Sequence, residues 1–302
     1  MSPTPGANDD RPARLLLSID FEDWHQLVRR RVRAPGWQLP GPALARQTDA
    51  LLALLDDMAL RATFFILGMT ARAHPDLVQA IAARGHEIGS HGDRHLPVHG
   101  QTRSEFGADL RAARTTIEQL TGHTPLGYRA PAFSVTTESS WAYEIMAEEG
   151  LGYDASQHDS PRIPNRVVCS SRSPHQLELA GGRTLWEFPA AVWCAGRLRI
   201  PVGGASYWAL MPTAVVLHGL ARAGPLAGVY LHPYELDPEP LDAALATGAP
   251  MRARVEGRLR ALQRNAARRR GVDILRAVAE RHRLIPYGDA YAELAGGTAA
   301  RP

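Results

Sequence analysis

The feature that most constrains this fold is a repeated alternation of short apolar runs with helix-like segments. The apolar run RLLLSIDF (14–21) is followed by helical spacing over residues 42–58, and RATFFILG (61–68) is followed by a second helical segment over 74–86. Short continuous apolar runs are typical of strands buried in a parallel sheet, which helices connect and cover. The pattern therefore predicts an α/β fold with helices packed on a parallel sheet.

The alternation weakens in the middle of the chain and returns near its end. A third strand is predicted at EIGSH (87–91), whereas residues 159–228 are less regular and richer in Pro, Gly and Arg. A strand returns at AGVYLHP (227–233), and a long helix over about 251–283 is expected to break near Gly271. We find no internal repeat and no linker long enough to separate two domains.

Polar groups follow directly after four of the predicted strands. These places are SIDFEDWH, EIGSHGDRH, GYRAPAF and VYLHPYE. In parallel α/β folds the chemistry gathers at the carboxyl ends of the strands, so these groups would converge on one mouth if the sheet closes into a barrel. The side chains that would meet there are Asp20, Glu22, Asp23, His91, His95, Arg129 and His232.

Two of the histidines lie four residues apart, as in a metal site. The chain contains 12 histidines, so His91 and His95 could also be an ordinary pair. If residues 92–95 begin a helical turn, the two imidazoles share a face and could bind one ion. Two histidines and one carboxylate are a common facial set for Zn²⁺. A metal-held water, a carboxylate base and a separate histidine acid are the equipment for hydrolysing an amide or ester.

With these motifs in order, the sequence resembles the polysaccharide deacetylases of the NodB-homology class, carbohydrate esterase family 4. The motifs that carry the resemblance are LSIDFEDW, ATFFILG, GHEIGSHGDRH, GYRAPAFS, GYDAS and YLHP. The segments LWEFP, IPVGGASYWALMP and YLHPYELDP resemble the branch associated with bacterial exopolysaccharide and exosortase gene clusters. The resemblance implies a distorted, incomplete (β/α) barrel, seven-stranded and TIM-like, formed by a single domain over residues 14–295.

The resemblance also implies a role for each motif residue. Asp20 would be the general base, His91 and His95 metal ligands, Arg129 the tether of Asp20, and His232 the general acid. Water would attack the carbonyl carbon of an N-acetyl group, and acetate would be released from the sugar amine. The expected metal is Zn²⁺, with Co²⁺ or Ni²⁺ also compatible. The expected partner is an N-acetylated glycan, either a polysaccharide, an oligosaccharide or a lipid-linked precursor.

The acidic motif departs from the commonest family form, which has two adjacent aspartates. Here Asp20 is followed by Phe21, Glu22 and Asp23. An Asp-x-Asp arrangement, found in some branches, would place the third metal ligand at Glu22, which we favour. Strand geometry could instead favour Asp23, so both remain candidates.

Two other functions compete with a deacetylase. Related barrels hydrolyse amides such as allantoin with similar residues, and a narrow mouth containing carboxylate-binding arginines would favour that substrate. The altered acidic motif also allows a catalytically silent glycan-binding protein. Several residues could form a sugar subsite or simply pack in the core; these are Pro131, Phe133, Trp186, Tyr207 and Trp208.

Composition limits the kinds of partner and the cellular location that we expect for the protein. The net charge is +3, the sequence pI is about 9.1 and all 34 basic residues are Arg. We interpret the basic run RNAARRRG (264–271) as a solvated helix face rather than a phosphate site, and we expect no nucleic-acid partner. No apolar run approaches the roughly 18 residues of a membrane span, so an integral membrane protein is not expected.

The ends of the chain and its cysteines suggest a cytoplasmic protein. Residues 1–13 lack the apolar core of a signal peptide and are predicted to be a disordered lead-in, and residues 296–302 a flexible tail. Cys169 and Cys194 form no close ligand pair and are expected to be free thiols in a reducing compartment. The sequence does not determine the oligomeric state.

Overall fold

The computed structural model describes residues 12–160, 171–243, 245, 248–268 and 270–296. The predicted lead-in and tail lie almost wholly outside the described residues, as does Cys169. Cys194 is a free thiol, as expected. None of the helices among the described residues combines the length and the apolarity needed to cross a bilayer.

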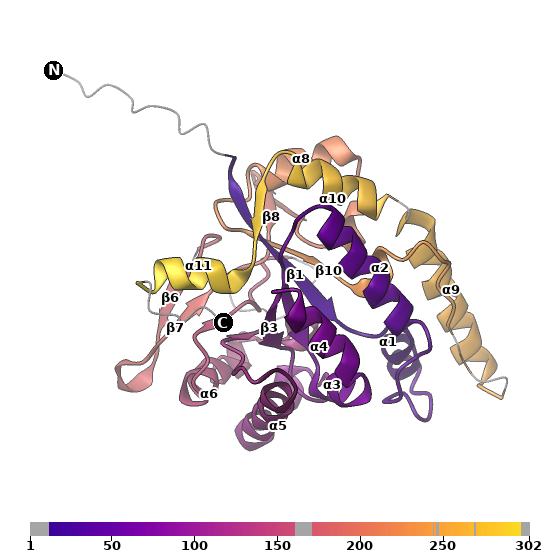
Figure 1. The fold of residues 1–302 in the computed structure, drawn as a ribbon, viewed down its shortest axis with the longest axis horizontal. Helices are drawn as coiled ribbons and strands as arrows, with labels where there is room; N and C mark the ends of the chain where they lie inside the picture. The colour runs from indigo at the N-terminus through magenta and orange to yellow at the C-terminus, as the bar shows by residue number, and fades with distance from the viewer. Residues whose placement is uncertain (1–11, 161–170, 244, 246–247, 269, 297–302) are drawn as a thin grey trace.

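A curved parallel sheet forms the centre of the molecule (Figure 1). Seven strands follow one another in the order β10-β1-β2-β3-β4-β5-β7, and every neighbouring pair is parallel. In chain order these strands are β1 (Arg14–Phe21), β2 (Thr63–Ile66), β3 (Glu87–Ser90), β4 (Gly127–Tyr128), β5 (Tyr153–Asp154), β7 (Thr184–Glu187) and β10 (Gly228–Leu231). This run confirms the seven-stranded α/β prediction.

The sheet does not close into a complete barrel. β6 (His175–Glu178) adds an antiparallel edge beside β7, and β11 (Arg283–Ile285) pairs with the start of β1. Among the described residues, an isolated parallel bridge between Ala190 and Gly228 links the chain after β7 back to β10. A separate hairpin is formed by β8 (Val192–Ala195) and β9 (Leu198–Pro201). The distorted, incomplete barrel expected from the resemblance is therefore confirmed.

Helices connect the strands and surround the sheet (Figure 1). They are α1 (Trp24–Arg31), α2 (Leu44–Asp57), α3 (Gly68–Ala73), α4 (Pro75–Ala83), α5 (Arg103–Thr121), α6 (Ala142–Glu148), α7 (Ala205–Trp208), α8 (Thr213–Leu220), α9 (Met251–Arg268), α10 (Gly271–Ala279) and α11 (Tyr287–Leu294). The predicted break near Gly271 is confirmed, because α9 ends before it and α10 begins there. The short α1, directly after the acidic motif, was not predicted.

Local sequence explains where these elements begin and end. From Leu15 to Phe21 every residue of β1 is buried, as expected for a central strand. Helix α5 begins with a capping box in which Thr102 and Glu105 each bond the other's backbone N–H, and it ends at Gly122 with φ +74°. The main apolar core lies between the sheet and helices α2, α4, α8 and α10. This packing fixes the carboxyl ends of the strands, where the polar motifs lie.

Candidate functional site

Asp20, at the carboxyl end of β1, is held by a buried arginine. Nη1 of Arg129 donates to Oδ1 of Asp20 over 2.7 Å and to Ser18 Oγ over 2.6 Å. Nη2 donates to the Tyr287 hydroxyl and Nε to the carbonyl of Ala155. Burial opposes the charge of Arg129, but Asp20 and Tyr287 hold the pKa of its guanidinium above the ordinary value. In the described part of the chain no hydrogen bond is made to Oδ2 of Asp20, so this oxygen is available for a proton.

Glu22 lies between the two predicted histidine ligands. Its Oε1 is 2.6 Å from Nε2 of His95 and 2.8 Å from Nε2 of His91. Nδ1 of His91 is 2.7 Å from the carbonyl oxygen of Arg129, a contact that assigns the proton to Nδ1 and turns Nε2 toward Glu22. The three ligand atoms lie within 4.8 Å of one another, and all three residues are buried. This donor set suits a divalent metal ion.

The helical turn considered as one way to bring His91 and His95 together does not form. The segment is a loop in which Gly92 has φ +78° and His95 has φ +54°. A Cβ at Gly92 would lie 2.7 Å from Oδ2 of Asp109, so the loop requires glycine here. Two left-handed residues, not a helical face, bring the imidazoles together, with ring centroids 5.5 Å apart. Such strain is common at functional sites.

Asp23, the other candidate ligand, is used differently. It is the N-cap of α1: its Oδ1 accepts from the backbone N–H of Gln26, and its Oδ2 accepts from that of Gly41. Both oxygens are therefore occupied by backbone donors. The structure brings Glu22, rather than Asp23, to the two histidines.

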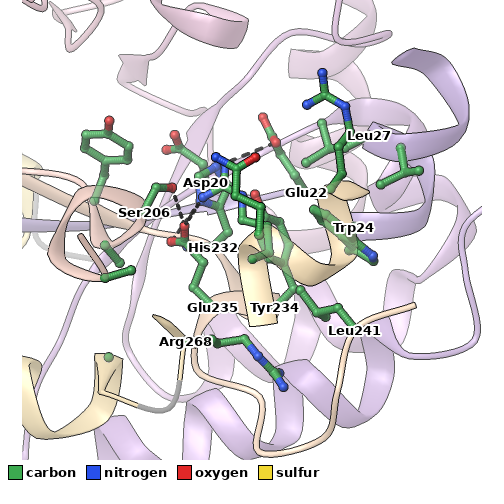
Figure 2. A pocket seen from close by; sticks show the side chains of 18 of the residues that line it. Asp20, Glu22, Trp24, Leu27, Ser206, His232, Tyr234, Glu235, Leu241 and Arg268 are labelled. Carbon is green, nitrogen blue, oxygen red and sulfur yellow. Dashed lines mark hydrogen bonds and ion pairs between the residues drawn. The ribbon is translucent and has the colours of Figure 1, made fainter. Parts of the chain in front are cut away.

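His232 follows β10 and faces the same cluster. Its Nε2 lies 3.7 Å from Oε2 of Glu22, and its Nδ1 lies 3.0 Å from Oε2 of Glu235. The other carboxylate oxygen of Glu235 accepts from Ser206 Oγ and, over 3.3 Å, from Nη1 of Arg264. Figure 2 shows Glu235 beside both His232 and Ser206. The glutamate fixes the imidazole so that Nε2 faces the cavity.

Glu235 was not among the predicted site residues. The signal was present in HPYE, where Pro233 begins a tight turn and a carboxylate follows the histidine by three residues. A turn of this kind lets the Glu235 side chain bond both the ring and the backbone N–H of His232.

Ion pairing sets the charge states of the cluster. Burial opposes the charge of His232, but the neighbouring Glu235 carboxylate raises the pKa of His232 to about 9. Burial also opposes the charge of Glu235, yet His232 holds the pKa of Glu235 below its ordinary value. At Glu22, burial is outweighed by His95 and His91, so the pKa lies well below 4.5. Glu22 is therefore an ionised donor.

The cluster lines one end of a cavity of about 520 Å³. Asp20, Glu22 and His232 belong to its wall (Figure 2), and so does His95. A second hollow of about 960 Å³ adjoins it, because the two share four lining residues. These are Leu27, Arg31, His95 and Ala132. The site therefore opens into an extended groove.

The five residues considered for a sugar subsite separate into those that line the cavity and those that do not. Phe133 and Tyr207 line the cavity. Trp208 is fully buried and donates its Nε1–H to a backbone carbonyl, while Trp186 stacks on Phe188 in another part of the core. Pro131 is buried and does not line the cavity. Of these five residues, Phe133 and Tyr207 are thus placed to contact a substrate.

The basic run over 264–271 is not simply a solvated helix face. Arg268 is 8% exposed and donates to the carbonyl of Asp237, and Arg264 bonds Glu235. Both arginines line the cavity. The interpretation as a solvated face is wrong for these two residues, because α9 packs the side that carries Arg264 and Arg268 against the site.

A second pair of acidic residues, Asp154 and Glu187, is connected by hydrogen bonds to the backbone next to Arg129. Asp154, in the GYDAS motif, pairs in register with Glu187 of β7, and both are fully buried. Asp154 accepts from Ser156 Oγ, which in turn accepts from the backbone N–H of Ala130, next to Arg129. Burial and the charge of Asp154 raise the pKa of Glu187 well above its ordinary value. The pair holds a proton and fixes the backbone beside Arg129.

Comparison with known proteins identifies part of the chain. Residues 40–149 match the family model described as polysaccharide deacetylase. Over these residues the chain is similar to polysaccharide deacetylases. Residues 158–270 match a second model, described as a domain of unknown function. Strands from both matched segments belong to the same sheet. His91 and His95 lie in the first matched segment and His232 in the second, whereas Asp20 and Glu22 precede both.

Curated relatives match over about a third of the chain. A peptidoglycan-N-acetylglucosamine deacetylase of Bacillus cereus is 30% identical over 98 residues, which are 32% of this chain and 36% of that protein. A peptidoglycan deacetylase of Helicobacter pylori is 30% identical over 106 residues, 35% of each protein. The chain thus spans about a third of the length of these relatives.

Similarity to solved structures extends over the whole chain. A Mycobacterium smegmatis structure named as a polysaccharide deacetylase matches with TM-score 0.62 and 20% identity, covering 100% of this chain and 99% of that one. An allantoinase matches with TM-score 0.57 and 16% identity, covering 99% and 96%. At these identities the matches define the fold, which both kinds of protein share.

Proposed function

We propose that the protein is a metal-dependent N-deacetylase that releases acetate from an N-acetylated amino-sugar glycan. The observation that carries the proposal is the convergence of Glu22, His91 and His95 beside Asp20 and His232 in one cavity. The family match over residues 40–149 supports the same chemistry. We assign the metal ligands as Glu22, His91 and His95, and leave Asp23 as a helix cap.

The residues present fit a divalent ion. Two imidazole nitrogens point at one carboxylate oxygen, and the tautomer of His91 is fixed by the carbonyl of Arg129. Zn²⁺ suits this nitrogen and oxygen set, and Co²⁺ or Ni²⁺ would also fit. When bound, such an ion polarises a carbonyl oxygen and acidifies a water molecule.

Two side chains, Asp20 and His232, transfer protons, and a third, Glu235, orients His232. Oδ2 of Asp20 takes a proton from the attacking water, because Oδ1 is occupied by Arg129. As the water oxygen bonds to the acetyl carbon, Nε2 of His232 gives a proton to the sugar nitrogen, and the carbon–nitrogen bond breaks. Glu235 holds Nδ1 of His232 and stabilises its protonated form. The products are acetate and the free amino sugar.

The shape of the site favours a glycan over a small cyclic amide. The cavity is continuous with a larger hollow, and Phe133 and Tyr207 offer aromatic faces for sugar rings. An allantoinase was expected to have free carboxylate-binding arginines in a narrow mouth, whereas Arg264 here already bonds Glu235. We infer a polymeric, oligomeric or lipid-linked glycan as substrate. The exopolysaccharide branch and the cytoplasmic location remain predictions.

Acetate release tests this proposal. Zinc-loaded protein is expected to release acetate from N-acetylated chitooligosaccharides or peptidoglycan fragments, and Asp20→Asn to abolish the release. Turnover of allantoin without acetate release would favour the amide hydrolase instead. Saturable glycan binding, unchanged in Asp20→Asn and without any acetate, would indicate the silent binding protein.

A further inference from the structure

Helix α9 exposes a continuous apolar stripe to solvent. Met251, Val255, Leu259 and Leu262 are spaced by four, four and three residues, so they share one helix face. Their exposed fractions lie between 48% and 72%. Of the nine large hydrophobic residues exposed in the described part of the chain, four are on this helix. Contiguous exposed apolar surface of this kind usually marks an interaction site.

The opposite face of α9 is already used by the fold. Ala253, Gly257 and Ala261 are buried, and a Cβ at Gly257 would lie 3.6 Å from Val28 of α1. Arg264, on the same side, lines the catalytic cavity. Figure 1 shows α9 along the outer edge of the molecule. The apolar stripe therefore faces away from the protein.

Arginines border the stripe. Arg252 precedes Val255 by three residues and Arg258 precedes Leu262 by four, so each neighbours the stripe along the helix. Both arginines are exposed, and neither forms an ion pair among the described residues. The single acidic residue of α9, Glu256, is already paired with arginines of α1 and of its own helix. The border is therefore strongly cationic.

This combination defines the partner by its chemistry. A partner must offer an apolar layer and anionic groups side by side. A second copy of α9 would supply the apolar layer, but in a two-fold contact it would place arginines near arginines. An anionic lipid bilayer supplies both, with acyl chains beneath phosphate groups.

We propose that α9 docks the protein on an anionic membrane surface. The helix lies in the interface plane, with Met251, Val255, Leu259 and Leu262 in the boundary between headgroups and acyl chains. Arg252 and Arg258 bind lipid phosphates on either side of the stripe. This is a peripheral contact of one helix face, and it does not depend on the proposed deacetylase activity.

Vesicle flotation with the full chain tests the docking. Wild-type protein is expected to float with vesicles of equal parts phosphatidylcholine and phosphatidylglycerol, and not with phosphatidylcholine alone. Added salt should weaken the binding, because part of it is electrostatic. Absence of binding to the anionic vesicles would overturn the proposal.

Matched variants distinguish vesicle binding through the apolar stripe from nonspecific vesicle binding by exposed leucines elsewhere. Leu259→Ser/Leu262→Ser should weaken vesicle binding by about tenfold or more, since two leucines no longer enter the lipid. The control Leu39→Ser/Leu198→Ser alters leucines that are 66% and 60% exposed, close to the 61% and 66% of the stripe leucines, and should bind as wild type. Equal losses in both double variants would contradict the docking site.

The arginines are tested in the same way. Arg252→Gln/Arg258→Gln should weaken binding and reduce its salt dependence, whereas Arg197→Gln/Arg281→Gln, which alters exposed arginines elsewhere, should not. Circular dichroism checks that each variant is folded. If wild type instead forms a dimer that Leu259→Ser/Leu262→Ser dissociates, and vesicles are not bound, the stripe is a contact between copies and the membrane proposal is wrong. Acetate release, measured separately, reports on the proposed function.

Discussion

Glu22 and Glu187 are both buried at the ends of strands of one sheet, but they carry opposite charge states. Glu22 is 5% exposed and faces three histidines, which hold its pKa well below 4.5. Glu187 is 0% exposed and faces Asp154, and burial together with the charge of Asp154 raises its pKa well above 4.5. The same burial produces an ionised donor at one place and a protonated acid at the other. Neighbouring groups, not burial, decide which acid can hold a cation.

Replacement of a carboxyl group by an amide distinguishes the two cases. Gln and Asn imitate the protonated acid but cannot carry its charge. An acid that must be ionised should therefore lose its function in such a variant, and an acid that is already protonated should keep it. The following variants test this comparison in order of expected effect.

Glu22→Gln is expected to have the largest effect. Without the charge at Glu22, two neutral histidines should not retain the ion, and activity should fall by about a thousandfold or more. Bound metal per chain, measured by mass spectrometry, checks this. Asp23→Asn, one residue further on, is the control and should keep its metal. Loss of metal in Asp23→Asn but not in Glu22→Gln would reverse our assignment of the third ligand.

Asp20→Asn should lower kcat by about a thousandfold while the metal stays bound. The carboxylate is required as a proton acceptor, and Arg129 still bonds the amide oxygen, so the fold should persist. Steady-state kinetics and metal content, measured on the same sample, check both parts. Loss of the metal as well would mean that Asp20 is a ligand rather than the base.

Glu235→Gln should have an intermediate effect, lowering kcat by about ten- to a hundredfold with little change in KM. The amide still bonds His232 but no longer stabilises its positive charge. Because we propose that His232 protonates the leaving nitrogen, hydrolysis of p-nitrophenyl acetate, which has a good leaving group, should be affected much less than that of an N-acetyl sugar. An equal loss on both substrates would indicate a structural role only.

Glu187→Gln should have the smallest effect on activity, because Glu187 is already protonated. Wild type and Glu187→Gln should differ instead in the pH dependence of the free energy of unfolding. At pH values above 4.5, the ordinary pKa of a glutamate, the folded protein keeps a proton at Glu187 that the unfolded chain has lost. The wild-type free energy of unfolding therefore falls as the pH rises. The variant should lack this decline, which is on the order of 1 kcal/mol or more. Urea denaturation at several pH values measures it; parallel curves would show that Glu187 is ionised in the folded state.

Sequence patterns were sufficient for the sheet and for most of the site. Asp20 lies at the carboxyl end of an apolar strand. Strands are likewise followed by Glu22, His91, Arg129 and His232, and parallel strands bring such positions to one edge. These side chains could be located because their backbone positions follow from strand order alone. Their chemical roles still rest on the resemblance and await the experiments above.

The features that could not be predicted depend on local backbone or on distant packing. The loop from His91 to His95 turns through two left-handed residues, which helical spacing cannot represent. Glu22 rather than Asp23 lies beside the two histidines partly because the backbone N–H of Gly41, 18 residues further along the chain, bonds the Asp23 carboxylate. The role of Arg264 depends on how α9 packs on the site, and periodicity shows only that a helix has two faces.

Metal titration against acetate release tests the central claim most directly. Metal-free protein is titrated with zinc while acetate release from an N-acetylated chitooligosaccharide is followed, in wild type and in His91→Ala/His95→Ala. We predict that wild-type activity rises and reaches a plateau at about one ion per chain, and that the double variant stays inactive. Acetate release that is independent of metal, or equal in the two proteins, would contradict the account.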